Sequence, residues 1–232
     1  MFVQGRIQLE VSAKMFDKYL ECFRGLDWED VSQVTNRAQA PLASLANDRT
    51  ALAELFARLE TSSELINLSE HLTWCDKIVL HEDRCRDTGF RLRLHFFMPG
   101  YSDRPHSHRW SFSTYVLKGG YQHTIYGSDV EFERAATPVI RASMVRFEQA
   151  GARYSLHHSA MHSFSAEPFT VSLVVRGPAV KDRSIQFDPA HNRTSWKYGT
   201  KDESTADQVR ARLDRERLAH VIRELRRYGV IT

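Results

Sequence analysis

Cysteine is scarce in this sequence of 232 residues, which has only Cys22, Cys75 and Cys85 and no CxxC pair. An odd number without paired spacing implies no disulfide framework, so we expect a reducing compartment and a cytoplasmic protein. No apolar run is long enough to span a bilayer, so no membrane association is expected. An excess of one charge is also missing, because 32 basic and 29 acidic side chains leave a net charge of +3. The basic residues are scattered, and nucleic acid is therefore not an expected partner.

The composition is that of a globular protein with a substantial core, at 42% hydrophobic and 26% charged residues. Residues 1–75 form a predicted helical N-terminal extension, although the polar stretch 28–48, which contains Pro41, is predicted to be loop. Residues 181–232 are predicted to be a cover segment followed by a helix that begins at Ser204. We expect one structural unit, in which the N-terminal helices cover a sheet face or contribute to a homodimer interface.

Residues 76–180 differ from both ends of the chain, because short runs of β-branched and aromatic residues alternate with Gly, Asp and Pro. This pattern predicts an antiparallel β-sandwich or barrel. In the run FRLRLHFF, residues 90–97, one face is apolar and the other carries Arg91, Arg93 and His95. The polar face of such a strand points either to solvent or into the polar lumen of a small barrel.

Histidine is abundant, and most of the 11 histidines lie in this strand-rich segment. His106 and His108 are two residues apart, so on a strand they would point to the same face. A third histidine from a neighbouring strand would complete a set of three nitrogen ligands, and imidazole suits Fe, Cu, Zn and Ni alike. The candidates for this third ligand are His157, His158 and His162.

Two spacing patterns surround these histidines. The first is G-x5-H-x-H-x4-S-x6-G from Gly100 to Gly120, and the second is G-x5-H-x-S-x2-H-x3-A from Gly151 to Ala166. Together they resemble the paired motifs of the cupin superfamily over about residues 85–178. The first departs from that pattern at Ser113, where cupins carry a glutamate ligand, and the second departs at a proline, an inner glycine and an asparagine. The resemblance favours His162 as the third ligand.

The resemblance implies a mainly β fold, a cupin-type double-stranded β-helix (jelly-roll barrel), with N-terminal helices and a C-terminal helix. A site of three histidines without the glutamate is most similar to the thiol dioxygenases of the cysteine dioxygenase type. That similarity implies Fe(II) as the metal, with Zn, Ni or Mn as alternatives. It does not extend to the substrate residues, because Arg176 stands where those enzymes have a catalytic tyrosine and their substrate-binding arginine falls near His81.

In a cupin barrel the polar face of residues 90–97 would line the lumen, where arginine side chains suit a carboxylate or phosphate. The candidates for substrate binding are Arg91, Arg93, His95, Tyr115 and His123. The candidates for catalysis are His157, His158 and Arg176, with the two histidines available for acid–base steps.

Three functions remain open from the sequence. The first is an Fe(II)-dependent oxygenase or dioxygenase that acts with O2 on a small anionic metabolite. The second is a non-oxidative metal-dependent cupin, an isomerase, lyase or hydrolase in which the metal acts as a Lewis acid. The third is a regulatory cupin that binds a ligand without chemistry.

Overall fold

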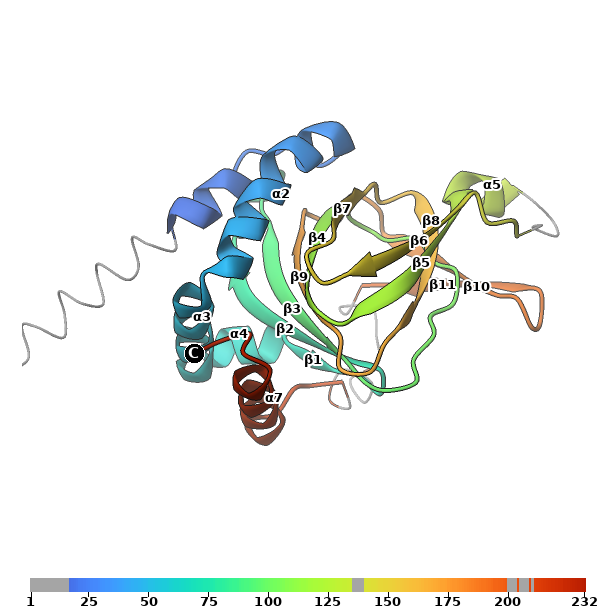
Figure 1. Cartoon of the computed structure of the whole chain (residues 1–232). Coiled ribbons are helices and arrows are strands. Elements are labelled where there is room, and N and C mark those ends of the chain that lie inside the picture. Colours follow the sequence, from blue (N-terminus) through green and yellow to red (C-terminus); the bar gives the residue numbers. More distant parts are fainter. Residues whose placement is uncertain (1–16, 135–139, 200–203, 205–208, 210) are drawn as a thin grey trace, which may run out of the picture.

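The computed structural model describes residues 17–134, 140–199, 204, 209 and 211–232, so the start of the predicted N-terminal extension lies outside it (Figure 1). The helices are η1 (Glu21–Phe23), α2 (Val31–Asn47), α3 (Arg49–Thr61), α4 (Ser63–Leu68), α5 (Asp129–Arg134) and α7 (Arg215–Arg227). The first strands are β1 (Glu70–His71), β2 (Cys75–Glu82), β3 (Arg91–Phe97), β4 (Phe112–Lys118), β5 (Gly120–Ser128) and β6 (Met144–Gln149). The later strands are β7 (Arg153–Leu156), β8 (Ala160–Ala166), β9 (Val171–Arg176), β10 (Arg183–Asp188) and β11 (Arg193–Tyr198).

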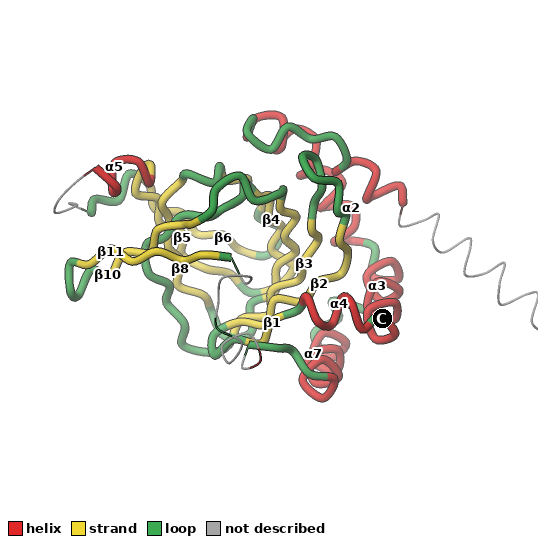
Figure 2. The backbone as a smooth tube through the Cα atoms, turned by 180° about the vertical axis from the view of Figure 1, so that it is seen from behind, coloured by secondary structure: helices red, strands yellow, loops and turns green. Residues whose placement is uncertain are grey.

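The strands form a jelly roll with helical additions. The larger sheet of the described chain has the order β1-β2-β3-β9-β4-β7, and a smaller one has the order β6-β5-β8, with β10 and β11 paired beside it. All pairings between the strands are antiparallel. The smaller sheet faces one side of the larger one, and helices α2, α3, α4 and α7 cover the other side (Figures 1 and 2).

The alternation predicted for residues 90–97 explains how β3 serves both layers. Leu92, Leu94 and Phe96 are at most 1% exposed and pack in one core with the helices. Phe97 belongs to a second core between the two sheets, so Arg93, which shares its face, also points between the sheets. Because β3 is covered on both sides, its polar face lines the lumen and does not point to solvent.

The loop predicted for residues 28–48 is wrong, because most of this segment forms α2. Asp30 caps the helix by accepting hydrogen bonds from the backbone N–H groups of Ser32 and Gln33. Pro41 lies inside the helix, where a proline costs about 3 kcal/mol. The buried stripe that offsets this cost comprises Val34, Ala38, Leu42 and Leu45.

The C-terminal helix predicted from Ser204 is interrupted, because Val209 is helical but the residues just before α7 are not. Helix α7 starts at Arg215 and is capped by Asp214, whose carboxylate accepts a hydrogen bond from the backbone N–H of Arg217. The described residues 211–213 are not helical, whereas residues 205–208 and 210 of the predicted helix lie outside the described chain. The Asp214 side chain therefore sets the start of α7, because a capping residue accepts hydrogen bonds from backbone N–H groups of the first turn that have no partner within the helix.

A buried ion pair attaches α7 to the large sheet. Asp76 of β2 is fully buried, and its Oδ2 accepts hydrogen bonds from Arg217 Nε at 3.0 Å and Nη2 at 2.8 Å. The other oxygen, Oδ1, lies 2.5 Å from His71 Nδ1. Both carboxylate oxygens are thus satisfied, which offsets the cost of burying the charge.

Candidate metal centre

His106 and His162 are brought together by strand pairing. The short segment around His106 forms bridges to β8 at His162 and to β10 at Gln186. The backbone N–H of His106 donates to the carbonyl of His162 at 2.8 Å, and the reverse hydrogen bond is 2.9 Å. Directly opposed residues of an antiparallel pair point to the same face, and His108, two residues along, shares that face.

The three histidines converge on one point. One ligand nitrogen from each of His106, His108 and His162 lies within 4.8 Å of the others. The Nε2 atoms of His108 and His162 are 2.8 Å apart. Nitrogen ligands at right angles around a metal with bonds of 2.0–2.1 Å are separated by about 3.0 Å, so this spacing fits a metal ion.

Contacts to Nδ1 of His106 orient its imidazole ring. Its Nδ1 donates to the backbone carbonyl of Arg104 at 2.9 Å and lies 3.1 Å from Oδ2 of Asp103. This arrangement leaves Nε2 for the other two histidines. A carboxylate on the far nitrogen is the usual outer contact of a metal-binding histidine, because it sets the tautomer and raises ligand basicity.

His162 is oriented by a second histidine that sequence reasoning assigned to substrate binding. His123 is fully buried, and its Nε2 lies 2.9 Å from Nδ1 of His162. On its other side, His123 Nδ1 lies 3.5 Å from Oε1 of Glu148. Both ring nitrogens of His123 therefore face protein groups, which places this ring behind His162 as seen from the other two histidines.

Burial favours the neutral form of two of the three ligands, His108 and His162. Desolvation lowers the pKa of His108 and of His162 well below the usual histidine value, and the nearby His106 lowers both further. Desolvation, followed by the charge of Arg146, lowers the pKa of His123 to about 3. Neutral imidazole is the form that donates a lone pair to a metal, so the donor set fits a metal ion at neutral pH.

Ser113 does not occupy the position of the missing glutamate ligand. It is fully buried between β4 and β7, where its Oγ accepts a hydrogen bond from Ser155 Oγ at 3.1 Å. The residue before it, Phe112, faces the histidines, with ring centroids 5.0 Å from His108 and 6.0 Å from His162. Alternation along β4 turns Ser113 to the helix side, so the Phe112 ring and not the Ser113 hydroxyl faces the three histidines.

A positively charged patch lies in the same lumen. Arg93 is 6% exposed, and Arg93 Nε, Arg176 Nε and His95 Nε2 are buried without a hydrogen-bond partner in the described chain. Desolvation lowers the pKa of Arg93 to about 10, and also lowers that of Arg176. The Arg176 guanidinium lies 4.5 Å from the Trp110 ring, which is 5.8 Å from the ring of His108.

Other predicted site residues lie elsewhere. Arg91 donates to both carboxylate oxygens of Glu82 and is already neutralised. Tyr115 packs against the core shared with the helices, on the outer side of β4. His157 and His158 are not grouped with the triad, but with Glu29. Neither the pairing of His123 with His162 nor the part played by Glu29 had a signal in the sequence, because both depend on the fold.

The outer contact of His162 leads to a first prediction. The His123→Phe variant keeps the ring volume but removes Nε2, so affinity for zinc at the triad should fall by about 10–100-fold. Competition with a chromophoric chelator would measure the change. Tyr126→Phe is the matched control, because it deletes a 2.8 Å hydrogen bond from β5 to Ser163 of β8 without touching the ligands. Equal affinities in both variants would contradict the orienting role.

No protein-family model matches the sequence, and no curated protein does. Among solved structures, the chain is similar to KdgF from Halomonas sp., with 16% identity over 46% of this chain and 82% of that one (TM-score 0.35). It is also similar to an RmlC-like cupin from Shewanella frigidimarina, with 14% identity over 49% and 86% of the two chains (TM-score 0.35). A third similar structure is an oxalate decarboxylase from Bacillus subtilis, with 13% identity over 49% and 28% of the two chains (TM-score 0.36).

None of the described helices has the length and apolar composition needed to cross a membrane. One of the similar structures is named as a cupin, the superfamily that the two histidine motifs resemble. His106, His108 and His162 supply the candidate metal ligands. The fold of the chain is the jelly roll with helical additions that the motifs predict.

Proposed function

We propose that this protein is a mononuclear Fe(II)-dependent oxygenase that acts with O2 on a small anionic metabolite. The observation that carries the proposal is the convergence of three histidines, with His108 and His162 Nε2 atoms 2.8 Å apart, in a lumen where two arginines, Arg93 and Arg176, each have a buried Nε without a partner in the described chain. His106, His108 and His162 would hold the metal. Bound Fe(II) would supply the redox chemistry that a reaction with O2 requires.

The arginines account for the substrate class. Arg93 is buried and Arg176 is partly buried, and each has a buried Nε–H without a hydrogen-bond partner in the described chain. A buried N–H group without an acceptor is costly, and a bound anion would supply the acceptor through charge-assisted hydrogen bonds. Trp110 lies between Arg176 and His108, so an anion on Arg176 would be held beside the triad.

The three candidate ligands are all histidines, and no carboxylate belongs to the group. This ligand set supports the proposed similarity of the metal site to that of the thiol dioxygenases. Phe112 contributes an apolar wall where a charged ligand would otherwise reduce the positive charge of the site. Arg176 replaces the catalytic tyrosine of those enzymes, so the substrate is proposed to differ from theirs. In this proposal, Arg176 binds the substrate and does not transfer a proton.

Metal and O2 assays test the proposal. Protein purified without oxygen should contain about one iron per triad and should consume O2 when supplied with its substrate, which can be sought among small carboxylates and phosphate esters. The Arg176→Gln variant should raise KM for that anion more than it lowers kcat, because it removes a binding contact. Full turnover without O2, with Zn, Ni or Mn at the triad acting as a Lewis acid, would instead establish the non-oxidative function, and saturable binding without turnover would establish the regulatory one.

A further inference from the structure

A second cluster of potential metal ligands lies outside the triad. Glu29 comes from the loop before α2, and His157 and His158 come from the turn between β7 and β8. Glu29 Oε2 lies 3.0 Å from His158 Nε2 and 3.5 Å from His157 Nε2. All three ligand atoms lie within 4.8 Å of one another, and the centroids of the two imidazole rings are 3.9 Å apart, with the rings tilted by 38°.

The protein holds these side chains in place. His157 Nδ1 lies 2.6 Å from Ser159 Oγ, so its Nε2 is the nitrogen left to face Glu29. The backbone N–H of His158 donates to Ser111 Oγ at 3.1 Å, which fixes the turn to the loop that follows His108. A hydroxyl on the far nitrogen of His157 is the kind of outer contact that orients a metal-binding histidine.

Glu29 is positioned by its neighbour Trp28. The indole is 3% exposed and packs so closely on Gly177 that a Cβ there would lie 2.3 Å from the ring. Glycine at 177 therefore permits the approach of the N-terminal loop to the barrel. The backbone N–H of Glu29 donates to Asp27 Oδ1 at 3.0 Å, which fixes the loop next to the carboxylate.

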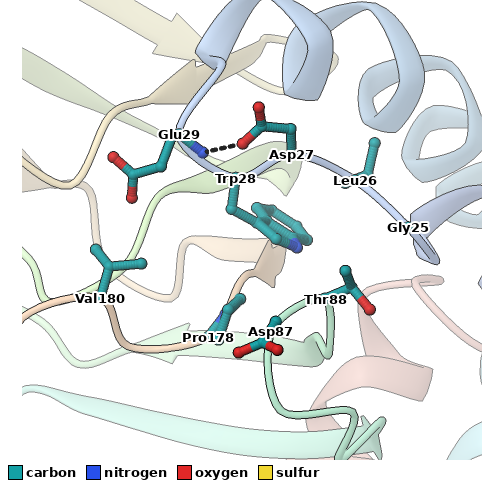
Figure 3. Close-up of a pocket in the computed structure, with 9 residues that line it drawn as sticks. All are labelled: Gly25, Leu26, Asp27, Trp28, Glu29, Asp87, Thr88, Pro178 and Val180. Atoms are coloured by element: carbon teal, nitrogen blue, oxygen red, sulfur yellow. Dashed lines mark hydrogen bonds between the residues drawn. The ribbon is translucent and has the colours of Figure 1, made fainter.

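The surroundings favour a cation. A cavity of about 310 Å³ borders Glu29 and is also lined by Trp28, Asp27 and Asp87 (Figure 3). Three carboxylates thus line one opening, and Figure 3 shows the Glu29 carboxylate on the Val180 side of it. The nearby cation, Lys181, is already paired with Asp129.

We propose that Glu29, His157 and His158 form a second divalent metal site that takes Zn²⁺. Ligands around a tetrahedral zinc with bonds of 2.0–2.1 Å are separated by roughly 3.3 Å, close to the observed 3.0 and 3.5 Å. Imidazole and carboxylate are both common zinc ligands, and a zinc ion held by three protein ligands takes water at its fourth position. Zinc bound here would link the N-terminal helical segment to the barrel, so it would stabilise the folded chain.

Zinc stoichiometry tests this site. The wild-type chain, stripped with a chelator and then dialysed against ZnCl2, should bind one more zinc than Glu29→Gln or His157→Ala, as measured by elemental analysis. Glu64→Gln is the matched control, because Glu64 is exposed to 59%, like Glu29 at 56%, and pairs with Arg84 without a neighbouring histidine. This control should bind as much zinc as the wild type.

The difference between variants separates this site from the triad. If the triad also binds zinc, the wild type should hold two zinc ions per chain and Glu29→Gln one. If the triad does not bind zinc, the wild type should hold one and Glu29→Gln none. Zinc should also raise Tm more in the wild type than in Glu29→Gln, with circular dichroism used to check that both chains are folded. Equal zinc content and equal Tm shifts in wild type and Glu29→Gln would overturn the proposal, whatever the triad does.

Discussion

The His162→Ala variant is expected to purify without bound iron. His162 supplies one of the three candidate ligand nitrogens and is 2% exposed. Its Nε2 atom lies 2.8 Å from Nε2 of His108. Loss of a direct ligand should weaken metal binding by more than the roughly 100-fold upper range for loss of an outer contact. Elemental analysis of anaerobically purified protein, with circular dichroism to confirm folding, would measure the effect.

The control for this experiment decides between the candidate third ligands. His157→Ala changes a histidine of the same motif that lies with Glu29 and not with the triad. It should keep its iron while His162→Ala loses it. Iron retained by a folded His162→Ala variant would move the third ligand to His157 or His158 and would contradict the geometry described for the triad.

The Asp76→Ala variant should lose about 3–5 kcal/mol of unfolding free energy. The aspartate is fully buried, and its removal leaves Arg217 without its two hydrogen bonds and His71 without its partner. An uncompensated charge beside the core is the cause of the large expected cost. Urea unfolding followed by circular dichroism would measure it.

An exposed ion pair provides the comparison. Glu64→Ala removes the partner of Arg84 in a pair whose side chains are 59% and 66% exposed. Such pairs contribute about 0–1 kcal/mol, so this variant should remain close to the wild type. If the two substitutions cost the same, the buried pair would not be what attaches α7 to the sheet. A double variant, Asp76→Ala with Arg217→Met, tests the cause of the effect. It should recover part of the lost unfolding free energy if the unpaired Arg217 guanidinium caused that loss.

Period-two alternation and fixed spacing are local signals, so the sequence could predict the strand-rich segment and could single out His106, His108 and His162, which the structure brings together. The spacing alone does not determine the phase of a strand, so it could not show that the Ser113 side chain faces away from these histidines. Phe112 and Ser113 are adjacent, and only the pairing of β4 with β7 shows which one faces the histidines. A shift of one residue on a strand reverses the face.

Other parts depended on contacts between distant segments. The polar composition of residues 31–47 and Pro41 favour a loop, although the segment forms a helix. Its apolar stripe stabilises that helix only when it packs on the sheet, and this contact is not visible in the sequence. His123 and Glu29 gained their positions from strand pairing and from Trp28 on Gly177, respectively. Neither contact produces a periodic pattern in the sequence, so local patterns could not identify the positions of His123 and Glu29.

The pairing of the His106 segment with β8 and β10 makes the triad sensitive to folding order. His108 and His162 are separated by 54 residues, so the chain must close a long loop before both nitrogens can meet. A slip of one residue in β8 would turn His162 to the outside and bring Ser163 inward. Metal uptake during refolding should therefore be a late event, because it requires the native alignment of these strands.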